Sequence, residues 1–153
     1  MATKDRITCH VLDTSKGVPA RNIRVQLSTT LPPPTTSPSP PSTSFSNTPS
    51  SSTAGITHTF ESQTDDDGRI KSWLPYSTST SSGSVPVYTL EDVLTDVKGP
   101  TRWTLRFDTA GYFGGDDETF FPEAVVVFTV KEGQTYHVPL LLSPYSYTTY
   151  RGS

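Results

Sequence analysis

Apolar and polar residues alternate with a period of two along much of this chain. In "RITCHVL" the apolar residues Ile7, Cys9 and Val11 fall on one face of an extended strand while His10 falls on the other, because successive side chains of a strand point to opposite sides. The stretches "IRVQL", "RIKSWL" and "RWTLRFD" alternate in the same way. The pattern and two further apolar runs predict strands at 6–12, 23–27, 69–74, 102–108, 124–130 and 136–142.

The last two of these segments, "AVVVFTV" and "YHVPLLL", are nearly continuous apolar runs. Such runs suit strands that are covered on both faces. A two-sheet sandwich covers only the inner face of each sheet, so a second copy of the same surface in a symmetric homo-oligomer is the simplest cover for the outer face. Seven or eight short strands, with one short helical turn near 109–114, predict an all-β sandwich.

Two low-complexity segments interrupt the pattern. Residues 28–55 hold seven of the 14 prolines among serines and threonines, and this composition can neither bury apolar surface nor sustain a strand ladder. A shorter run at 77–84, "STSTSSGS", has the same character. We therefore expect residues 1–153 to form one domain, with a disordered loop insertion at 28–55 and a second loop at 77–84.

The charge balance and the cysteine content limit the partners and the cellular location that the sequence allows. The 12 Lys and Arg residues against 15 Asp and Glu residues give a net charge of −3, which leaves no basic surface for nucleic acid or an anionic membrane. No stretch is apolar enough to span a membrane. The single cysteine, Cys9, excludes an internal disulfide, and "MATKDRITCH" has no apolar segment typical of a secretory signal. An intracellular location, cytoplasmic or peroxisomal, is expected.

Three polar side chains break the apolar pattern: His137 inside "YHVPLLL", His10 inside "ITCHVL", and Arg69 directly after the turn "DDDG". Each taken alone is more often structural than catalytic, and His58 in "ITHTF" keeps that structural interpretation. The sequence has no His-Glu-x-x-His or Cys-x-x-Cys pair and no Gly-x-Ser-x-Gly elbow. A metal site or a serine or cysteine nucleophile is therefore not indicated.

The chain stops directly after an apolar strand, on Tyr150, Arg151, Gly152 and Ser153. Chain ends are usually frayed and rich in small polar residues. An end that carries an aromatic ring, a guanidinium group and a hydroxyl group suggests a terminus with a defined position. Nothing in "MATKD" indicates a packed or catalytic role for the other end.

Five stretches together resemble one known family. "CHVLDTSKGVPA", "TDDDGRI", "FDTAGYF", "FFPE" and "YHVPLLLSPYSYTTYRGS" are similar to the transthyretin-related proteins, the 5-hydroxyisourate hydrolases of purine breakdown. The resemblance implies a prealbumin-like sandwich of two four-stranded sheets and a homotetramer built as a dimer of dimers. It also implies active sites in clefts between dimers and no cofactor, and it places the two low-complexity runs as insertions.

The resemblance also assigns residues to an activity. The implied reaction is hydrolysis of 5-hydroxyisourate to 2-oxo-4-hydroxy-4-carboxy-5-ureidoimidazoline in urate degradation. The motifs place the catalytic groups at His10, Arg69 and His137, and the substrate-binding group at Tyr150, Arg151, Gly152 and Ser153. The alternative is a transthyretin-like carrier that binds a small aromatic ligand in the channel between dimers. The two histidines and the arginine favour the hydrolase, because an apolar carrier site gains nothing from burying charged groups.

Overall fold

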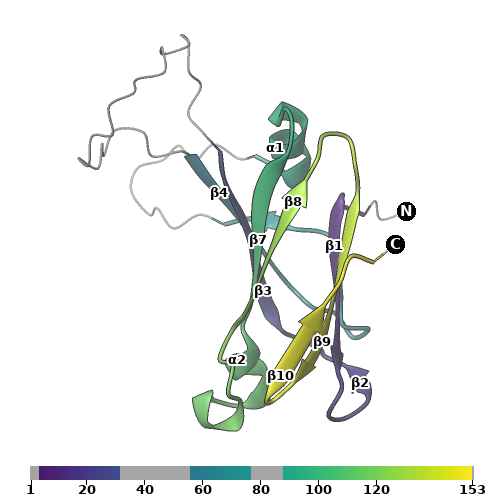
Figure 1. The fold of residues 1–153 in the computed structure, drawn as a ribbon, viewed down its shortest axis with the longest axis vertical. Coiled ribbons are helices and arrows are strands. Elements are labelled where there is room, and N and C mark those ends of the chain that lie inside the picture. The colour runs from purple at the N-terminus through teal and green to yellow at the C-terminus, as the bar shows by residue number, and fades with distance from the viewer. Residues whose placement is uncertain (1–3, 32–55, 77–87, 153) are drawn as a thin grey trace, which may run out of the picture.

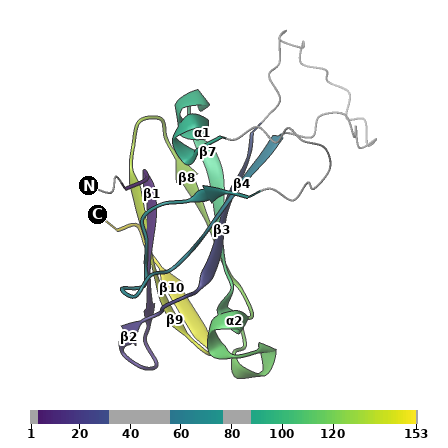
Figure 2. The same cartoon turned by 180° about the vertical axis from the view of Figure 1, so that it is seen from behind.

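A computed structural model describes residues 4–31, 56–76 and 88–152 of the chain. Two β-sheets pack face to face, and the short helices lie at the two ends of this sandwich (Figures 1 and 2). The strands are β1 (Ile7–Asp13), β2 (Val18–Pro19), β3 (Arg24–Leu31), β4 (Ile56–Gln63), β5 (Arg69–Ile70), β6 (Leu74–Pro75), β7 (Thr101–Phe107), β8 (Ala124–Val130), β9 (Tyr136–Ser143) and β10 (Ser146–Thr149). The helices are α1 (Leu90–Asp96), α2 (Thr109–Phe113) and the 3₁₀ turn η1 (Asp116–Glu118).

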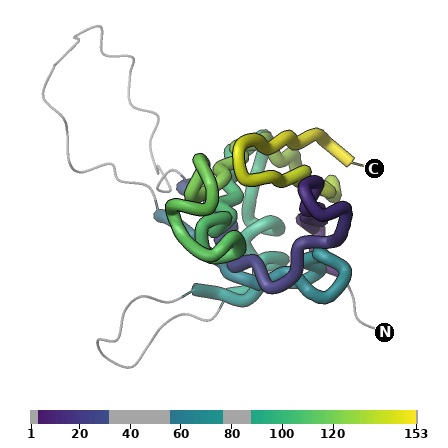
Figure 3. The backbone as a smooth tube through the Cα atoms, turned by 90° about the horizontal axis from the view of Figure 1, so that it is seen from below, coloured from purple at the N-terminus to yellow at the C-terminus, as the bar shows by residue number. Residues whose placement is uncertain are grey.

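The first sheet has the order β10-β9-β1-β2, and β5 also pairs with β1. β1 and β9 run parallel, and every other strand pair is antiparallel. Figure 3 shows purple β1 beside the yellow strands of the C-terminal end. β2 and β5 pair with different halves of the same edge of β1, so this sheet has five strands where four were predicted. The second sheet, β6-β4-β3-β7-β8, gains a fifth strand in the two-residue β6.

The core lies between the sheets and follows the predicted alternation. On β1, Ile7, Cys9 and Val11 are buried, and β7 buries every second residue, including Trp103 and Phe107. β8 buries its inner face within the single chain, whereas the cover predicted for its outer face is a second copy of the chain. Its burial alternates, with Val125 and Val127 left 38% and 56% exposed on the outer face of the chain.

Helix α1 was not predicted from the sequence, whereas α2 confirms the expected turn near 109–114. Thr89 caps α1 by accepting a hydrogen bond from the backbone of Asp92, whose carboxylate accepts one from the backbone N–H of Thr89. This reciprocal cap needs only a Thr-x-x-Asp sequence. Leu90, Val93 and Leu94 then bury one face of the helix, at the spacing that places them on a single side.

Two predicted boundaries need correction. The segment 69–74 is not one strand, because only Arg69–Ile70 pairs with β1 and the chain then crosses to pair Leu74–Pro75 with β4. Trp73 fixes this crossing, since its indole N–H donates to the carbonyl of Ile7 at 2.8 Å. The first loop was predicted to begin at residue 28, but β3 continues to Leu31 and pairs with β4. The rest of that loop, and the loop at 77–84, lie outside the described residues.

Asp13 joins the end of β1 to α2. The side chain is fully buried and accepts hydrogen bonds from the hydroxyl of Tyr112 at 2.7 Å, from the backbone N–H groups of Ser15 and Lys16, and from the Ser15 hydroxyl. Burial acts to raise the pKa of Asp13, but these hydrogen bonds outweigh it and lower the pKa below its ordinary value. The ionised carboxylate is therefore the form that the fold stabilises.

Asp13→Asn is expected to lower the free energy of unfolding at pH 7 by about 2 kcal/mol, because hydrogen bonds to a buried carboxylate are lost or weakened. A lowered folded-state pKa stabilises the native chain above the unfolded value of 3.8 and ceases to do so as the pH falls through the folded pKa. Urea unfolding at pH 7 and at pH 3 measures both effects, with Asp66→Asn as the exposed control. Equal stability of the two variants at pH 7 would contradict the role given to Asp13.

Candidate active site

The parallel pairing of β1 with β9 brings two of the predicted histidines together. Thr8 lies opposite His137 and His10 lies opposite Pro139, so both histidines fall on the outer face of the first sheet. Their ring centroids are 6.4 Å apart and the ring planes are inclined by 37°. Both side chains are half-buried, so they can meet a ligand from solvent.

A tight turn delivers Arg69 to the same place. The carboxylate of Asp65 accepts hydrogen bonds from the backbone N–H groups of Asp67 and Arg69, both at 2.9 Å. Gly68 is required in this turn, because its φ is +74° and a Cβ there would lie 2.3 Å from the carbonyl oxygen of Val11. The turn pairs Arg69 directly with His10 across the β1–β5 ladder.

The same turn orients the His10 ring. Nε2 of His10 lies 3.1 Å from the backbone carbonyl oxygen of Asp67. A carbonyl oxygen only accepts hydrogen bonds, so Nε2 carries the proton in this contact. When His10 is neutral, Nδ1 is therefore the nitrogen with the free lone pair.

His137 is held through its other ring nitrogen. Nδ1 of His137 lies 2.9 Å from the hydroxyl oxygen of Thr8, and that hydroxyl also lies 3.5 Å from the carbonyl oxygen of Tyr136. Burial lowers the pKa of His137, and the positive charges of Arg69, His10 and Lys4 lower it further. His137 is therefore neutral at pH 7.

The end of the chain packs against His137. The backbone N–H of Gly152 donates to the carbonyl oxygen of His137 at 2.8 Å, which makes an isolated antiparallel bridge. A Cβ on Gly152 would lie only 2.6 Å from Cδ2 of the His137 ring. The guanidinium carbon of Arg151 lies 4.8 Å from the centre of the Tyr136 ring. Tyr150 is 56% exposed, and Ser153 lies outside the described residues.

Two open hollows meet at His137. The first, which we call the cationic hollow, has a volume of about 470 Å³, and its lining includes Lys4, Arg6, Thr8, Arg69, His137 and Arg151. The second, of about 290 Å³, lies between β8 and the end of the chain, with Val127, His137 and Tyr150 in its wall. His137 and Arg151 line both hollows, whereas His10 and Tyr150 do not line the cationic hollow. The predicted site residues that the structure describes thus gather around His137.

Two residues of this region were missed from the sequence. Lys4 lines the cationic hollow, although "MATKD" had indicated no role, and Thr8 contacts the His137 ring. The alternation in β1 could have pointed to Thr8, which shares the face of His10, whereas Lys4 precedes the strand. The alternation does not show that β9 pairs with β1.

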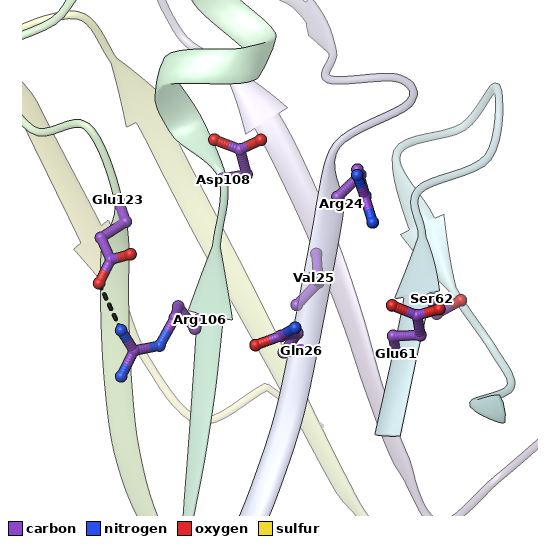
Figure 4. Close-up of a pocket in the computed structure, with 8 residues that line it drawn as sticks. All are labelled: Arg24, Val25, Gln26, Glu61, Ser62, Arg106, Asp108 and Glu123. Carbon is purple, nitrogen blue, oxygen red and sulfur yellow. Dashed lines mark hydrogen bonds and ion pairs between the residues drawn. The ribbon is translucent and has the colours of Figure 1, made fainter. Parts of the chain in front are cut away.

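A third hollow, of about 210 Å³, lies on the outer face of the other sheet (Figure 4). Its arginines, Arg24 and Arg106, are accompanied by three carboxylates, and Arg106 is paired with Glu123 at 2.7 Å. This surface carries one more negative than positive side chain and contains no histidine. Among the described residues no cluster of His, Cys, Asp or Glu could hold a metal ion, and no described helix is long and apolar enough to cross a membrane.

Known proteins match this chain along almost its whole length. A family model described as Transthyretin: HIUase/Transthyretin family covers residues 7–152. A 5-hydroxyisourate hydrolase from Mus musculus is 36% identical over 159 residues, which is 100% of each chain. A probable 5-hydroxyisourate hydrolase from Schizosaccharomyces pombe is 33% identical over 148 residues, which is 96% of this chain and 90% of that protein.

The fold agrees with these matches. Transthyretin from Sparus aurata superposes with a TM-score of 0.58 at 23% identity, covering 96% of each chain, and so confirms the predicted two-sheet sandwich. The resemblance first drawn from five short stretches extends over nearly the whole chain. The chain belongs to the HIUase/transthyretin family.

Proposed function

We infer that this protein hydrolyses 5-hydroxyisourate to 2-oxo-4-hydroxy-4-carboxy-5-ureidoimidazoline in urate degradation. Full-length relatives from mouse and fission yeast carry the name of this hydrolase. The observation that carries the inference is the placement of His10, Arg69 and His137 on one face of one sheet. These are proton-transfer and anion-stabilising groups, which the hydrolysis of a ring amide requires.

His137 is the proposed general base. If the hydroxyl of Thr8 donates to the carbonyl of Tyr136, it accepts from Nδ1–H of His137 and leaves Nε2 with a free lone pair. The lowered pKa keeps that nitrogen unprotonated at pH 7. Nε2 then takes a proton from water as the water oxygen bonds to the ring carbonyl carbon. The proton returns to the ring nitrogen when the C–N bond breaks.

Arg69 and His10 are proposed to stabilise the charge that forms. The tetrahedral intermediate places negative charge on the former carbonyl oxygen, and a guanidinium group offers several donors in a rigid plane to such an oxygen. His10 is held by the carbonyl of Asp67 and lies next to Arg69 in the ladder, where it assists proton transfer. We assign Tyr150, Arg151, Gly152 and Ser153 to substrate binding, with Gly152 also packed on the ring of His137.

Arg69→Lys is expected to lower kcat/KM by about tenfold or more, although the positive charge is retained. An ammonium group cannot reproduce the planar pair of donors, and the loss corresponds to about one charge-assisted hydrogen bond. Steady-state kinetics on Arg69→Lys and on the distant Arg102→Lys, which is exposed on β7, measure the effect. Unchanged kinetics in the Arg69 variant would remove this residue from the site.

The proposal includes a homotetramer, assembled as a dimer of dimers with the clefts between dimers. The exposed valines of β8, Val125 and Val127, and the half-buried Leu12 and Leu141 on the outer face beside the histidines support it, because such apolar surface is stabilised by a second copy. Sedimentation equilibrium tests the assembly, and a monomeric mass would contradict it.

A cytoplasmic or peroxisomal location is likewise proposed, supported by the single, unpaired Cys9.

The decisive experiment generates 5-hydroxyisourate with urate oxidase and follows its ultraviolet absorbance with and without the protein. We expect the decay to be much faster with the protein. Decay at the spontaneous rate would overturn the hydrolase. Tight binding of an aromatic ligand without turnover would instead support the carrier, which shares the fold seen in the Sparus aurata protein.

A further inference from the structure

The segment that precedes β1 is held against the candidate active site. The backbone N–H of Asp5 donates to the carbonyl of Lys71 at 2.8 Å, and the carboxylate of Asp5 accepts from the backbone N–H of Trp73 at 2.8 Å. On the other side, the backbone N–H of Tyr136 donates to the carbonyl of Arg6 at 2.6 Å. These hydrogen bonds fix the backbone at Asp5 and Arg6, the two residues that follow Lys4.

Lys4 reaches the candidate site from this segment, which precedes β1 and is not part of the strand. Lys4 lines the cationic hollow together with Arg69, His137 and Arg151. It also lines a smaller hollow of about 40 Å³ with Arg69 and His137. Lys4 is thus placed beside two of the groups assigned to the reaction.

The charges in the cationic hollow are unbalanced. The ion pairs among the described residues are Arg6–Glu91 at 2.6 Å and Arg106–Glu123 at 2.7 Å, so the charge of Arg6 is already matched. Lys4, Arg69 and Arg151 form no ion pair with a described residue. Among the described residues of the lining, Asp5 carries the acidic group, and its carboxylate accepts a hydrogen bond from the backbone N–H of Trp73. The hollow therefore favours an anionic ligand.

We propose that Lys4 is a substrate-binding residue, whose ammonium group pairs with the oxygen that becomes the product carboxylate. The inference rests on the proposed function. Hydrolysis of an amide joins the water oxygen to the carbonyl carbon, breaks the C–N bond and transfers a proton to nitrogen. The resulting acid then releases a proton at neutral pH. Negative charge thus persists on the former carbonyl group, where a second cation beside Arg69 stabilises it.

Two lysines flank β1 and make a matched pair for the test. Lys4 precedes the strand at the hollow, and Lys16 follows it in the turn at the opposite end, outside the lining of all four hollows described above. Replacement of either by Met removes one positive charge. Lys4→Met is expected to lower kcat/KM about tenfold, which corresponds to one charge-assisted hydrogen bond. Lys4→Arg should keep most of kcat/KM, and Lys16→Met should resemble the wild type.

A second measurement does not depend on turnover. The groups that face His137 are Arg69 on β5, His10 on β1, Lys4 before β1 and Arg151 after β10. Proton NMR titration of the His137 ring is expected to show a higher pKa in Lys4→Met than in the wild type or in Lys16→Met, since one repelling charge is gone.

The two measurements separate the ways in which the inference can fail. Equal kcat/KM values for Lys4→Met and Lys16→Met would overturn the role of Lys4 in binding. An unchanged His137 titration in Lys4→Met would overturn its placement beside that ring. A wild-type protein without turnover would overturn the proposed function instead, and the placement of Lys4 would still be decided by the titration.

Discussion

Replacement of His137 by Asn is expected to lower turnover by about 10²-fold or more while the sandwich stays folded, as is typical for the loss of a general base. The side-chain amide can still meet the hydroxyl of Thr8, which lies 2.9 Å from Nδ1 in the native protein. It has no nitrogen that can accept a proton from water at pH 7. The decay of freshly generated 5-hydroxyisourate measures turnover, and thermal melting measures the fold.

The three histidines of the chain supply the control. His10→Asn should also reduce turnover, because His10 lies 6.4 Å from His137 between ring centroids and is oriented by the Asp67 carbonyl. His58 lies on β4 of the other sheet and contacts Tyr88, so His58→Asn should leave kcat near the wild-type value. If His137→Asn turned over substrate as fast as His58→Asn, the histidine would be structural only.

The pH profile offers a further check on His137. Burial and the nearby cations lower its pKa, so the neutral, proton-accepting form persists as the pH falls below the ordinary value of 6.5. The pH at which kcat/KM declines on the acid side should therefore lie below 6.5. An acid limb above pH 6.5 would indicate that another group controls the rate.

Much of the fold follows from the alternation of side chains. β1 and β7 bury the residues that the period of two places on one face, because each strand has one side against the core. Helix α1 escaped prediction because it has only seven residues, too few for a sustained helical period. Its capping box, Thr89 to Asp92, was the available signal.

The candidate site was only partly accessible from the sequence. Motif resemblance supplied His10, Arg69 and His137, but no local pattern shows that β1 and β9 run parallel with Thr8 opposite His137. Strand register depends on contacts between segments far apart in the chain. For the same reason Lys4 was missed, since its place is fixed by hydrogen bonds of its neighbours to the segments around Lys71 and Tyr136.

Gly152→Ala is expected to lower kcat by about 10²-fold with little change in melting temperature. The added Cβ would lie 2.6 Å from Cδ2 of His137 and 3.2 Å from Cγ of Pro139. The His137 ring must move, or the terminus must lift and break the hydrogen bond from Gly152 to the His137 carbonyl. A displacement of about 1 Å at a reacting group costs on this order in rate, whereas the half-buried Gly152 contributes little core area.

A double-mutant cycle distinguishes this steric effect from a direct contact with substrate. If Gly152 acts through the His137 ring, Gly152→Ala should reduce turnover strongly in the native background and hardly at all in His137→Asn, because the double mutant has no general base left to displace. Equal losses in both backgrounds would show that Gly152 acts independently of His137. Proton NMR of the His137 ring in Gly152→Ala provides the structural readout. An unshifted ring signal together with normal turnover would mean that the terminus accommodates a methyl group, and that the end of the chain does not position the base.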